Sequence, residues 1–335
     1  MSNDVVAKRR LGRSGLEVSA WGLGTWALGG EVVNAEGIPG GYGDVDDAES
    51  EKGLYAAVEA GVDFIDTADI YGMGHSEEML RGVLRDHPEV LVATKVGNSF
   101  DIGSRTALGP NLTPEYIQQA VRASLERLGR DVIDVYQLHT FPLNDHEVDA
   151  IVDVFEDLVS EGLIRWYGVS NDDPAQIARF AQGEHCTLAQ IQLNVLDDNA
   201  AALQACADHD LGVLCRSPLA MGLLGGRYSE ATKIPANDIR GRQPEWLKWF
   251  TDGVPSPSYA AQLNAVREFL MSGGRTLAQG ALGWIWARSD VAVPLPGFRD
   301  ETQVRDNLGA FAHGPLEPAV FADIEAALGR GASAF

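Results

Sequence analysis

Eight short apolar runs alternate with helical patterns along this chain, and that alternation constrains its fold more than any other feature. The runs are rich in β-branched or aromatic residues, which suits strands that are buried on both faces. They lie at residues 19–24, 62–66, 91–95, 133–138, 164–169, 189–193, 211–215 and 291–294. Strands that alternate with helices form parallel βαβ units. In one domain of 335 residues, eight such units predict a closed (β/α)8 TIM barrel.

The helical segments between the runs begin with residues that are typical of helix N-termini. A side-chain oxygen at such a position accepts a hydrogen bond from a free backbone N–H, and a glutamate or glutamine three residues later can return one. These signals predict helices over 47–60, 113–128, 174–182 and 277–288, with cap residues Asp46, Thr113, Asp173 and Thr276.

An open, doubly wound sheet is the competing architecture. Such a sheet normally carries the glycine pattern G-x-G-x-x-G after its first strand, where the backbone approaches a pyrophosphate. The segment Gly22-Leu23-Gly24-Thr25-Trp26 lacks that full pattern, which favours the barrel.

We expect residues 1–335 to form a single domain, with a short N-terminal hairpin over 5–20 and a C-terminal helix over 317–328. Long connections follow the first, third and seventh strands, at 25–45, 97–112 and 217–257. All three leave the C-terminal ends of strands, where a barrel builds its site, so the barrel should carry long βα loops on its C-terminal face.

The charge balance limits the classes of molecule that the protein is expected to bind. With 26 Lys and Arg against 48 Asp and Glu, the net charge is −22, which disfavours both nucleic acids and anionic membranes. The three cysteines show no disulfide framework, and no His or Cys spacing is typical of a metal site. No signal peptide or membrane span is apparent, so we expect a cytoplasmic protein whose partner is a small molecule. The oligomeric state stays open.

Ionisable side chains stand at or just after the ends of neighbouring strands. Asp66 ends the second run and Tyr71 follows five residues later. Lys95 ends the third run, and His139 lies just past the fourth. Neighbouring strand ends converge at one mouth of a barrel, so Lys95 should lie between Asp66 and Tyr71. Asp66 would keep the lysine protonated, and the ammonium would lower the pKa of Tyr71. Tyr71 would then act as general acid toward a carbonyl oxygen that His139 orients, without a metal.

One segment reads Gly61-Val62-Asp63-Phe64-Ile65-Asp66-Thr67-Ala68-Asp69-Ile70-Tyr71-Gly72 and is followed by Gly74-His75-Ser76-Glu77. This segment resembles the signature of the aldo-keto reductase superfamily. The resemblance runs from Leu11-Gly12 to Asn307 and is greatest to the bacterial and channel-β-subunit-like branch. It implies an NAD(P)H-dependent oxidoreductase, with Tyr71, Asp66, Lys95 and His139 as the catalytic tetrad.

The resemblance also implies NADPH (or NADP+ in the reverse direction), bound in an extended form without a Rossmann domain. The positions that match cofactor-binding residues are Gly24, Thr25, Trp26, Ser170, Asn171, Gln190, Arg216, Ser217, Pro218, Leu219, Gly222, Leu223, Gly297, Phe298, Arg299, Gln303 and Asn307. Arg299 carries the preference for NADP over NAD, because a guanidinium binds a phosphate in a bidentate way.

Two positions depart from the pattern of the family. Arg216 stands where many relatives carry an aromatic residue that stacks on the nicotinamide, and Gln192-Leu193 stands where Pro-Tyr is frequent. A guanidinium can also stack on a ring, but it repels the positive ring of the oxidised cofactor. We therefore hypothesise that Arg216 biases binding toward NADPH and the reaction toward carbonyl reduction.

The sequence leaves three substrate classes open: aldehydes, ketones and open-chain sugars. The last class would suit a role in carbohydrate metabolism. The candidate substrate residues are Trp26, Tyr71, His139, Phe100, Trp246 and Trp249. Packing of the last loop onto the barrel is an equal alternative for its aromatic residues. Two other functions remain: a cofactor-binding regulatory subunit with little turnover, and a Schiff-base lyase that uses Lys95 as nucleophile.

Overall fold

The eight predicted strands all form, and they lie in one sheet whose spatial order follows the order of the chain. The computed structural model describes residues 6–139, 143–228, 232–242 and 244–331. Each strand pairs in parallel with the next. The strands are β3 (Leu23–Gly24), β5 (Phe64–Asp66), β6 (Leu91–Val96), β9 (Ile133–Leu138), β10 (Ile164–Ser170), β11 (Cys186–Gln192), β12 (Gly212–Arg216) and β15 (Ala292–Pro294).

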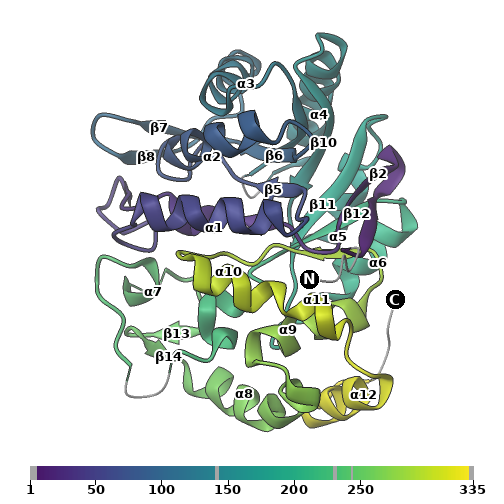
Figure 1. Ribbon diagram of the computed structural model, residues 1–335. Helices are drawn as coiled ribbons and strands as arrows, with labels where there is room; N and C mark the ends of the chain where they lie inside the picture. The colour runs from purple at the N-terminus through teal and green to yellow at the C-terminus, as the bar shows by residue number, and fades with distance from the viewer. Residues whose placement is uncertain (1–5, 140–142, 229–231, 243, 332–335) are drawn as a thin grey trace.

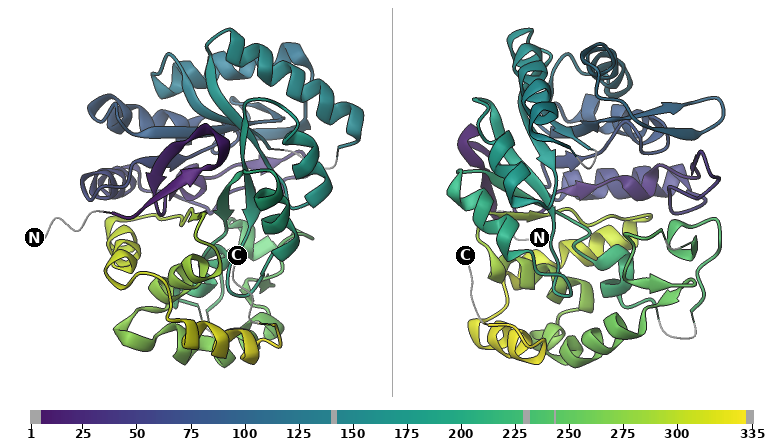
Figure 2. Two further views of the ribbon diagram at one scale, coloured as in Figure 1. Left: turned by 90° about the vertical axis from the view of Figure 1, so that its right-hand side faces the viewer. Right: turned by 180° about the vertical axis from the view of Figure 1, so that it is seen from behind.

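The last strand returns to the first and closes the sheet. Gly22 N donates to Pro294 O at 3.0 Å, and Gly24 N donates to Pro296 O at 3.2 Å. A further parallel bridge joins Gly24 to Gly297. Figures 1 and 2 show the resulting ring of strands with helices around it. The prediction of a (β/α)8 barrel is therefore confirmed, and the open sheet is wrong.

An N-terminal hairpin covers one end of the barrel. Strands β1 (Lys8–Leu11) and β2 (Leu16–Ser19) pair antiparallel around the 3₁₀ turn η1 (Gly12–Ser14). Gly12 lies so close to the barrel that a Cβ there would be 2.2 Å from Thr187 O. Leu11 and Val18 pack on the apolar side chains inside the barrel, which are Phe64, Ala93, Val135, Leu188, Leu214, Val293 and Leu295. In Figure 1 this hairpin lies at the opposite end from β7, β8, β13 and β14, so it leaves the C-terminal mouth of the barrel open for a site.

Helices pack around the strands, and their predicted caps mostly form. The Asp46 side chain accepts hydrogen bonds from Ala48 N and Glu49 N, and Thr276 forms a reciprocal capping box. Asp173 also caps its helix, but Gln176 bonds to Asn171 instead of completing a box. The helices are α1 (Asp47–Glu59), α2 (His75–Asp86), α3 (Pro114–Leu128), α4 (Asp145–Ser160), α5 (Pro174–Phe180), α6 (Ala200–Asp208), α8 (Pro257–Leu270), α9 (Leu277–Arg288), α10 (Glu301–Leu308), α11 (Ala310–His313) and α12 (Pro318–Ala327).

None of the helices in the described part of the chain combines the length and the apolar composition that crossing a bilayer requires.

The long βα connections contain small elements of their own. The first holds the 3₁₀ turn η2 (Trp26–Leu28) and β4 (Val33–Asn34), and the second holds the hairpin of β7 (Asn98–Asp101) and β8 (Thr106–Pro110). Because β4 pairs with β8, these two loops form one small sheet beside the barrel mouth. The third holds η3 (Ala220–Gly225), α7 (Ile239–Arg242), β13 (Phe250–Thr251) and β14 (Val254–Pro255).

Candidate active site

A buried ion pair lies at the C-terminal mouth of the barrel, where β5 and β6 end. Lys95 Nζ donates to Asp66 Oδ1 at 2.5 Å and to Thr67 O at 2.7 Å, and Lys95 is fully buried. The other carboxylate oxygen of Asp66 accepts from Gln137 Nε2 at 2.8 Å and from Gln190 Nε2 at 2.9 Å. A charged pair away from water is stable only when its remaining hydrogen-bonding capacity is satisfied, as it is here. Although burial opposes its charge, Asp66 and Tyr71 raise the pKa of Lys95, which keeps the lysine protonated.

Tyr71 projects from the loop after β5 toward this pair. Its hydroxyl is 3.4 Å from Lys95 Nζ. The loop can approach the first connection only because Gly72 has no side chain: a Cβ there would be 2.2 Å from Gly29 O, and its φ is +65°. As predicted, the Lys95 ammonium acts to lower the pKa of Tyr71. Burial has the larger, opposite effect, so the pKa of Tyr71 is raised above its ordinary value of 10.0.

His139 follows β9 and faces Tyr71. The two ring centroids are 5.9 Å apart, and the ring planes are perpendicular. Backbone contacts fix the residue: His139 N donates to Val96 O at 2.8 Å, and Asn98 Nδ2 donates to His139 O at 2.6 Å. Burial, together with the cations Lys95 and Arg216, lowers the pKa of His139 to about 3. The imidazole is therefore neutral near pH 7, with one N–H available as a donor.

These side chains lie in a cleft of about 1270 Å³ at the barrel mouth. Asp66, Tyr71 and His139 line it, whereas Lys95 lies behind them. The cleft also receives nearly all the residues that the family resemblance assigns to the cofactor, namely Gly24, Thr25, Trp26, Ser170, Asn171, Gln190, Arg216, Ser217, Pro218, Leu219, Gly222, Gly297, Phe298, Arg299, Gln303 and Asn307. Leu223 is the exception, because it is 1% exposed and packs in the core.

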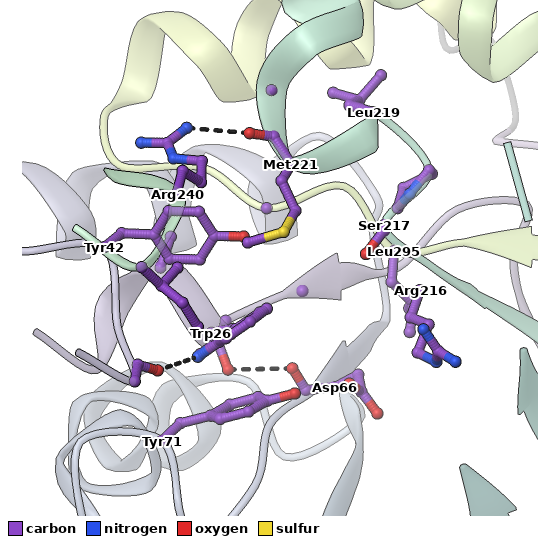
Figure 3. A pocket seen from close by; sticks show the side chains of 18 of the residues that line it. Trp26, Tyr42, Asp66, Tyr71, Arg216, Ser217, Leu219, Met221, Arg240 and Leu295 are labelled. Carbon is purple, nitrogen blue, oxygen red and sulfur yellow. Dashed lines mark hydrogen bonds between the residues drawn. The ribbon is translucent and has the colours of Figure 1, made fainter. Parts of the chain in front are cut away.

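An aromatic wall forms one side of the cleft. The ring centroid of Trp26 is 6.0 Å from that of Tyr71, 5.1 Å from that of Tyr42 and 6.1 Å from that of Trp246. Trp26 Nε1 donates to Gly40 O at 3.0 Å, which fixes the indole within its own loop. Figure 3 shows Tyr42, Trp26 and Tyr71 in succession along this side. We call Trp26, Tyr42 and Trp246 the aromatic wall.

Two predicted substrate residues do not reach the cleft. Trp249 is 2% exposed, and its Nε1 donates to Asp197 Oδ2 at 2.6 Å, so its apolar ring is buried and its polar atom is paired. The burial of Trp249 therefore favours the packing alternative over a substrate role for this residue. Phe100 lies on β7, where it pairs with Ala107, and it does not line the cleft either.

Arg216, at the end of β12, is held by an acidic neighbour. Its guanidinium forms an ion pair with Asp172 and donates to Gln192 Oε1 at 3.2 Å. Asp172 in turn accepts from Gln192 N at 2.7 Å and from Asn199 Nδ2 at 3.1 Å. The cation thus has a fixed place, from which it contributes to the low pKa of His139 and partly offsets the rise that burial causes in the pKa of Tyr71.

The sequence analysis missed three residues of this region. Gln137 is the register partner of Lys95, and a polar side chain within the apolar strand 133–138 was the available signal. Tyr42 lies in a glycine-rich loop, and Arg240 lies in the long loop after β12, where no local pattern marks them. In the described part of the chain, no cluster of three or more His, Cys, Asp or Glu side chains could hold a metal ion.

Comparison with known proteins decides the family. Residues 20–328 match the model of the Aldo/keto reductase family. The chain belongs to the aldo/keto reductase family. Bacterial relatives include an uncharacterized oxidoreductase, YqkF, from Bacillus subtilis, which is 30% identical over 90% of each chain. The NADH-specific methylglyoxal reductase of Escherichia coli is 31% identical over 90% of this chain and 92% of the relative.

Solved structures of family members agree with this fold. The holo form of aldo-keto reductase AKR11C1 from Bacillus halodurans is 27% identical over 98% of each chain, with a TM-score of 0.77. The glycerol dehydrogenase AKR11B4 from Gluconobacter oxydans is also 27% identical, covering 97% of this chain and 95% of its own, with a TM-score of 0.80. Membership of this family makes the chain an NAD(P)H-dependent oxidoreductase.

Proposed function

We propose that the protein reduces an aldehyde, ketone or sugar carbonyl to the alcohol with NADPH, in a reversible reaction for which Tyr71 is the general acid. The observation that carries this proposal is the cluster of Tyr71, Lys95, Asp66 and His139 at the base of one large cleft. Relatives named for carbonyl reduction support it, such as the methylglyoxal reductase of Escherichia coli. The Schiff-base alternative is disfavoured because Lys95 is fully buried and bonded to Asp66.

The donor set of the cleft fits a nicotinamide dinucleotide. Ser170, Asn171 and Gln190, at the ends of β10 and β11, offer the hydroxyl and amide groups that suit a carboxamide, close to Tyr71. Arg299 lines the same cleft beside the start of α10, where a cation and a helix N-terminus suit a phosphate. Arg299 is the reason for proposing NADPH. When bound, the reduced nicotinamide would supply a hydride, that is, a hydrogen together with the electron pair that forms the new C–H bond at the carbonyl carbon.

The residues of the chain would supply the proton and hold the substrate. Tyr71 Oη gives its proton to the carbonyl oxygen as the hydride reaches the carbon, so the carbonyl becomes a hydroxyl. The phenolate that remains is stabilised by Lys95, whose own charge is fixed by Asp66. Neutral His139 donates a hydrogen bond that orients the oxygen, and the aromatic wall excludes water from one side. Solvent then returns a proton to Tyr71.

The proposal is tested by cofactor binding followed by turnover. Because Trp26 and Trp246 line the cleft, NADPH should quench the intrinsic tryptophan fluorescence more strongly than NADH at equal concentration. Oxidation of bound NADPH is then followed with a panel of aldehydes, ketones and sugars. Turnover of a panel member supports the reductase. Quenching without turnover supports a regulatory subunit, and no quenching by either cofactor contradicts cofactor binding.

The pH dependence of carbonyl reduction should be flat over a wide range. Tyr71 donates only when protonated, and its pKa lies above 10.0, whereas His139 donates while neutral, above its pKa of about 3. We therefore expect kcat/KM to be constant from about pH 5 to about pH 9 and to fall only at higher pH. A decline centred near pH 6–7 that disappears in His139→Gln would contradict the assignment of a neutral imidazole.

Replacing Arg216 by tyrosine should change the relative affinity for the two redox forms of the cofactor. Since the guanidinium would repel the positive nicotinamide ring, Arg216→Tyr should improve NADP+ binding relative to NADPH by about threefold to tenfold. Asp172→Asn is the matched control, because it removes the counter-ion of Arg216. It should change the affinity ratio in the opposite direction and weaken NADP+ binding relative to NADPH. Fluorescence titration with both redox forms measures the ratio. An unchanged ratio in Arg216→Tyr would contradict the hypothesis.

A further inference from the structure

A buried cation lies at the upper end of the aromatic wall, away from the tetrad. Arg240, on α7, is 6% exposed and forms a bidentate pair with Asp238: Nε donates to Oδ1 at 2.9 Å and Nη2 to Oδ2 at 2.6 Å. Arg240 N also donates to Asp238 Oδ1 at 2.9 Å. The pair satisfies only one edge of the guanidinium, which leaves its Nη1 edge and both faces for other partners.

Aromatic rings from three separate segments surround the guanidinium. Its Cζ is 4.8 Å from the ring centroid of Tyr42, 5.1 Å from that of Tyr228 and 5.9 Å from that of Phe250. A cation within about 6 Å of a ring face is attracted by the ring, more strongly when both groups are buried. Arg240 therefore joins the loop after β3 to both ends of the long loop after β12.

The remaining donor of Arg240 holds the backbone of the segment between Ser217 and Gly226, which we call the cleft loop. Nη1 donates to Met221 O at 2.9 Å and to Tyr228 Oη at 2.7 Å. Met221 has a left-handed backbone, with φ +52° and ψ +34°. This conformation is strained for a non-glycine residue, so it needs external contacts to persist. The bond from Arg240 supplies one of them.

The same short helix is tied to the aromatic wall. Ile239 N donates to Gly41 O at 2.9 Å, and the neighbouring Gly40 O accepts from Trp26 Nε1 at 3.0 Å. A continuous set of contacts thus runs from Met221 through Arg240 and Tyr42 to Trp26, which stacks near Tyr71. Figure 3 shows Arg240, Tyr42, Trp26 and Tyr71 in this succession, with Arg216 and Ser217 across the cleft.

We propose that Arg240 is a positioning residue that couples the cleft loop to the aromatic wall, so that a cofactor held by the loop and a substrate held by the wall strengthen each other's binding. The inference rests on the proposed function. Arg240 touches no reacting atom and acts through Met221 and Tyr42. Coupling of this kind is reciprocal: the factor by which cofactor tightens substrate binding equals the factor by which substrate tightens cofactor binding.

Arg240→Lys is the decisive variant, because lysine keeps the charge beside Asp238 but has no planar fork to reach Met221 and the rings together. We expect NADPH to dissociate about tenfold faster, since the charge-assisted hydrogen bond that holds the cleft loop is lost. The dissociation rate is measured by stopped-flow recovery of tryptophan fluorescence. We also expect the substrate KM to rise severalfold while kcat changes little.

Arg242→Lys is the matched control. Arg242 lies on the same helix, is exposed, and donates to Ala236 O at 3.2 Å, away from the cleft. Its NADPH dissociation rate and KM should equal those of the parent protein. If Arg240→Lys fails to fold, Tyr42→Leu is the second variant. It removes one of the aromatic rings that pack on Arg240 without unpairing a buried charge, and it should still accelerate NADPH dissociation.

The outcomes separate this inference from the proposed function. If the parent protein binds no NADPH, the proposed function fails. If the parent binds and turns over but Arg240→Lys changes only the urea midpoint of unfolding, Arg240 is merely structural and the coupling is refuted. Faster dissociation together with a raised KM, and no such change in Arg242→Lys, supports the coupling.

Discussion

Tyr71→Phe is expected to lower kcat for carbonyl reduction by about 10²–10⁴-fold, because it removes the hydroxyl whose proton is transferred to the carbonyl oxygen in the proposed reaction. The hydroxyl that is lost lies 3.4 Å from Lys95 Nζ, and the ring itself is kept. Contacts of Tyr71 with Trp26 and His139 should therefore persist, and NADPH should still quench tryptophan fluorescence with nearly unchanged affinity. Steady-state turnover and fluorescence titration of the same preparation measure both quantities.

Tyr55→Phe is the control for this variant. Tyr55 lies on α1, and its hydroxyl donates to Asp86 Oδ2 at 2.7 Å outside the cleft. Its removal should leave kcat unchanged. A Tyr71→Phe variant that retains kcat within about threefold of the parent would show that another group, or water, supplies the proton.

Asp66→Asn should destabilise the fold as well as abolish efficient turnover. The substitution leaves the fully buried ammonium of Lys95 without a counter-ion, and breaking one side of a buried pair costs about 3–5 kcal/mol. Urea unfolding followed by circular dichroism should show a clearly lower midpoint. The double variant Asp66→Asn/Lys95→Met should recover much of the loss, since no unpaired charge remains.

Glu301→Gln is the matched surface control for the ion pair. Glu301 pairs with Arg305 one turn along α10, where both side chains contact solvent. Exposed pairs contribute little to stability, so this variant should unfold near the parent midpoint. An Asp66→Asn midpoint as high as that of Glu301→Gln would contradict this account, because it would mean that the buried Lys95 side chain is equally stable without a charged partner.

The barrel could be predicted from the sequence because its strands are buried on both faces and therefore have a continuous apolar pattern. All eight runs matched strands, including the short β3, and Asp46, Thr113 and Thr276 capped the expected helices. The hairpin of β7 and β8 was not predicted, since Asn98–Asp101 and Thr106–Pro110 lie outside the barrel and have little apolar alternation.

The site was predictable where backbone register fixes it and unpredictable where loops fold back on it. Asp66 and Lys95 stand on adjacent paired strands, so their meeting follows from the topology. Trp249 and Trp246 are three residues apart in one loop, yet one is buried and the other lines the cleft. The lowering effect of Lys95 on the pKa of Tyr71 was predicted, but the larger, opposing effect of burial was not, because the depth of a side chain cannot be inferred from the sequence.

Transfer of a label from the cofactor tests the central claim most directly. NADPH that carries deuterium at both hydrogen positions of nicotinamide C4 is mixed with the protein and the best carbonyl substrate of the panel, and the alcohol is analysed by mass spectrometry and NMR. The account predicts one deuterium on the carbinol carbon, and the same label in the little product that Tyr71→Phe forms. An alcohol without the label, or substrate trapped on Lys95 by borohydride in the absence of cofactor, would contradict it.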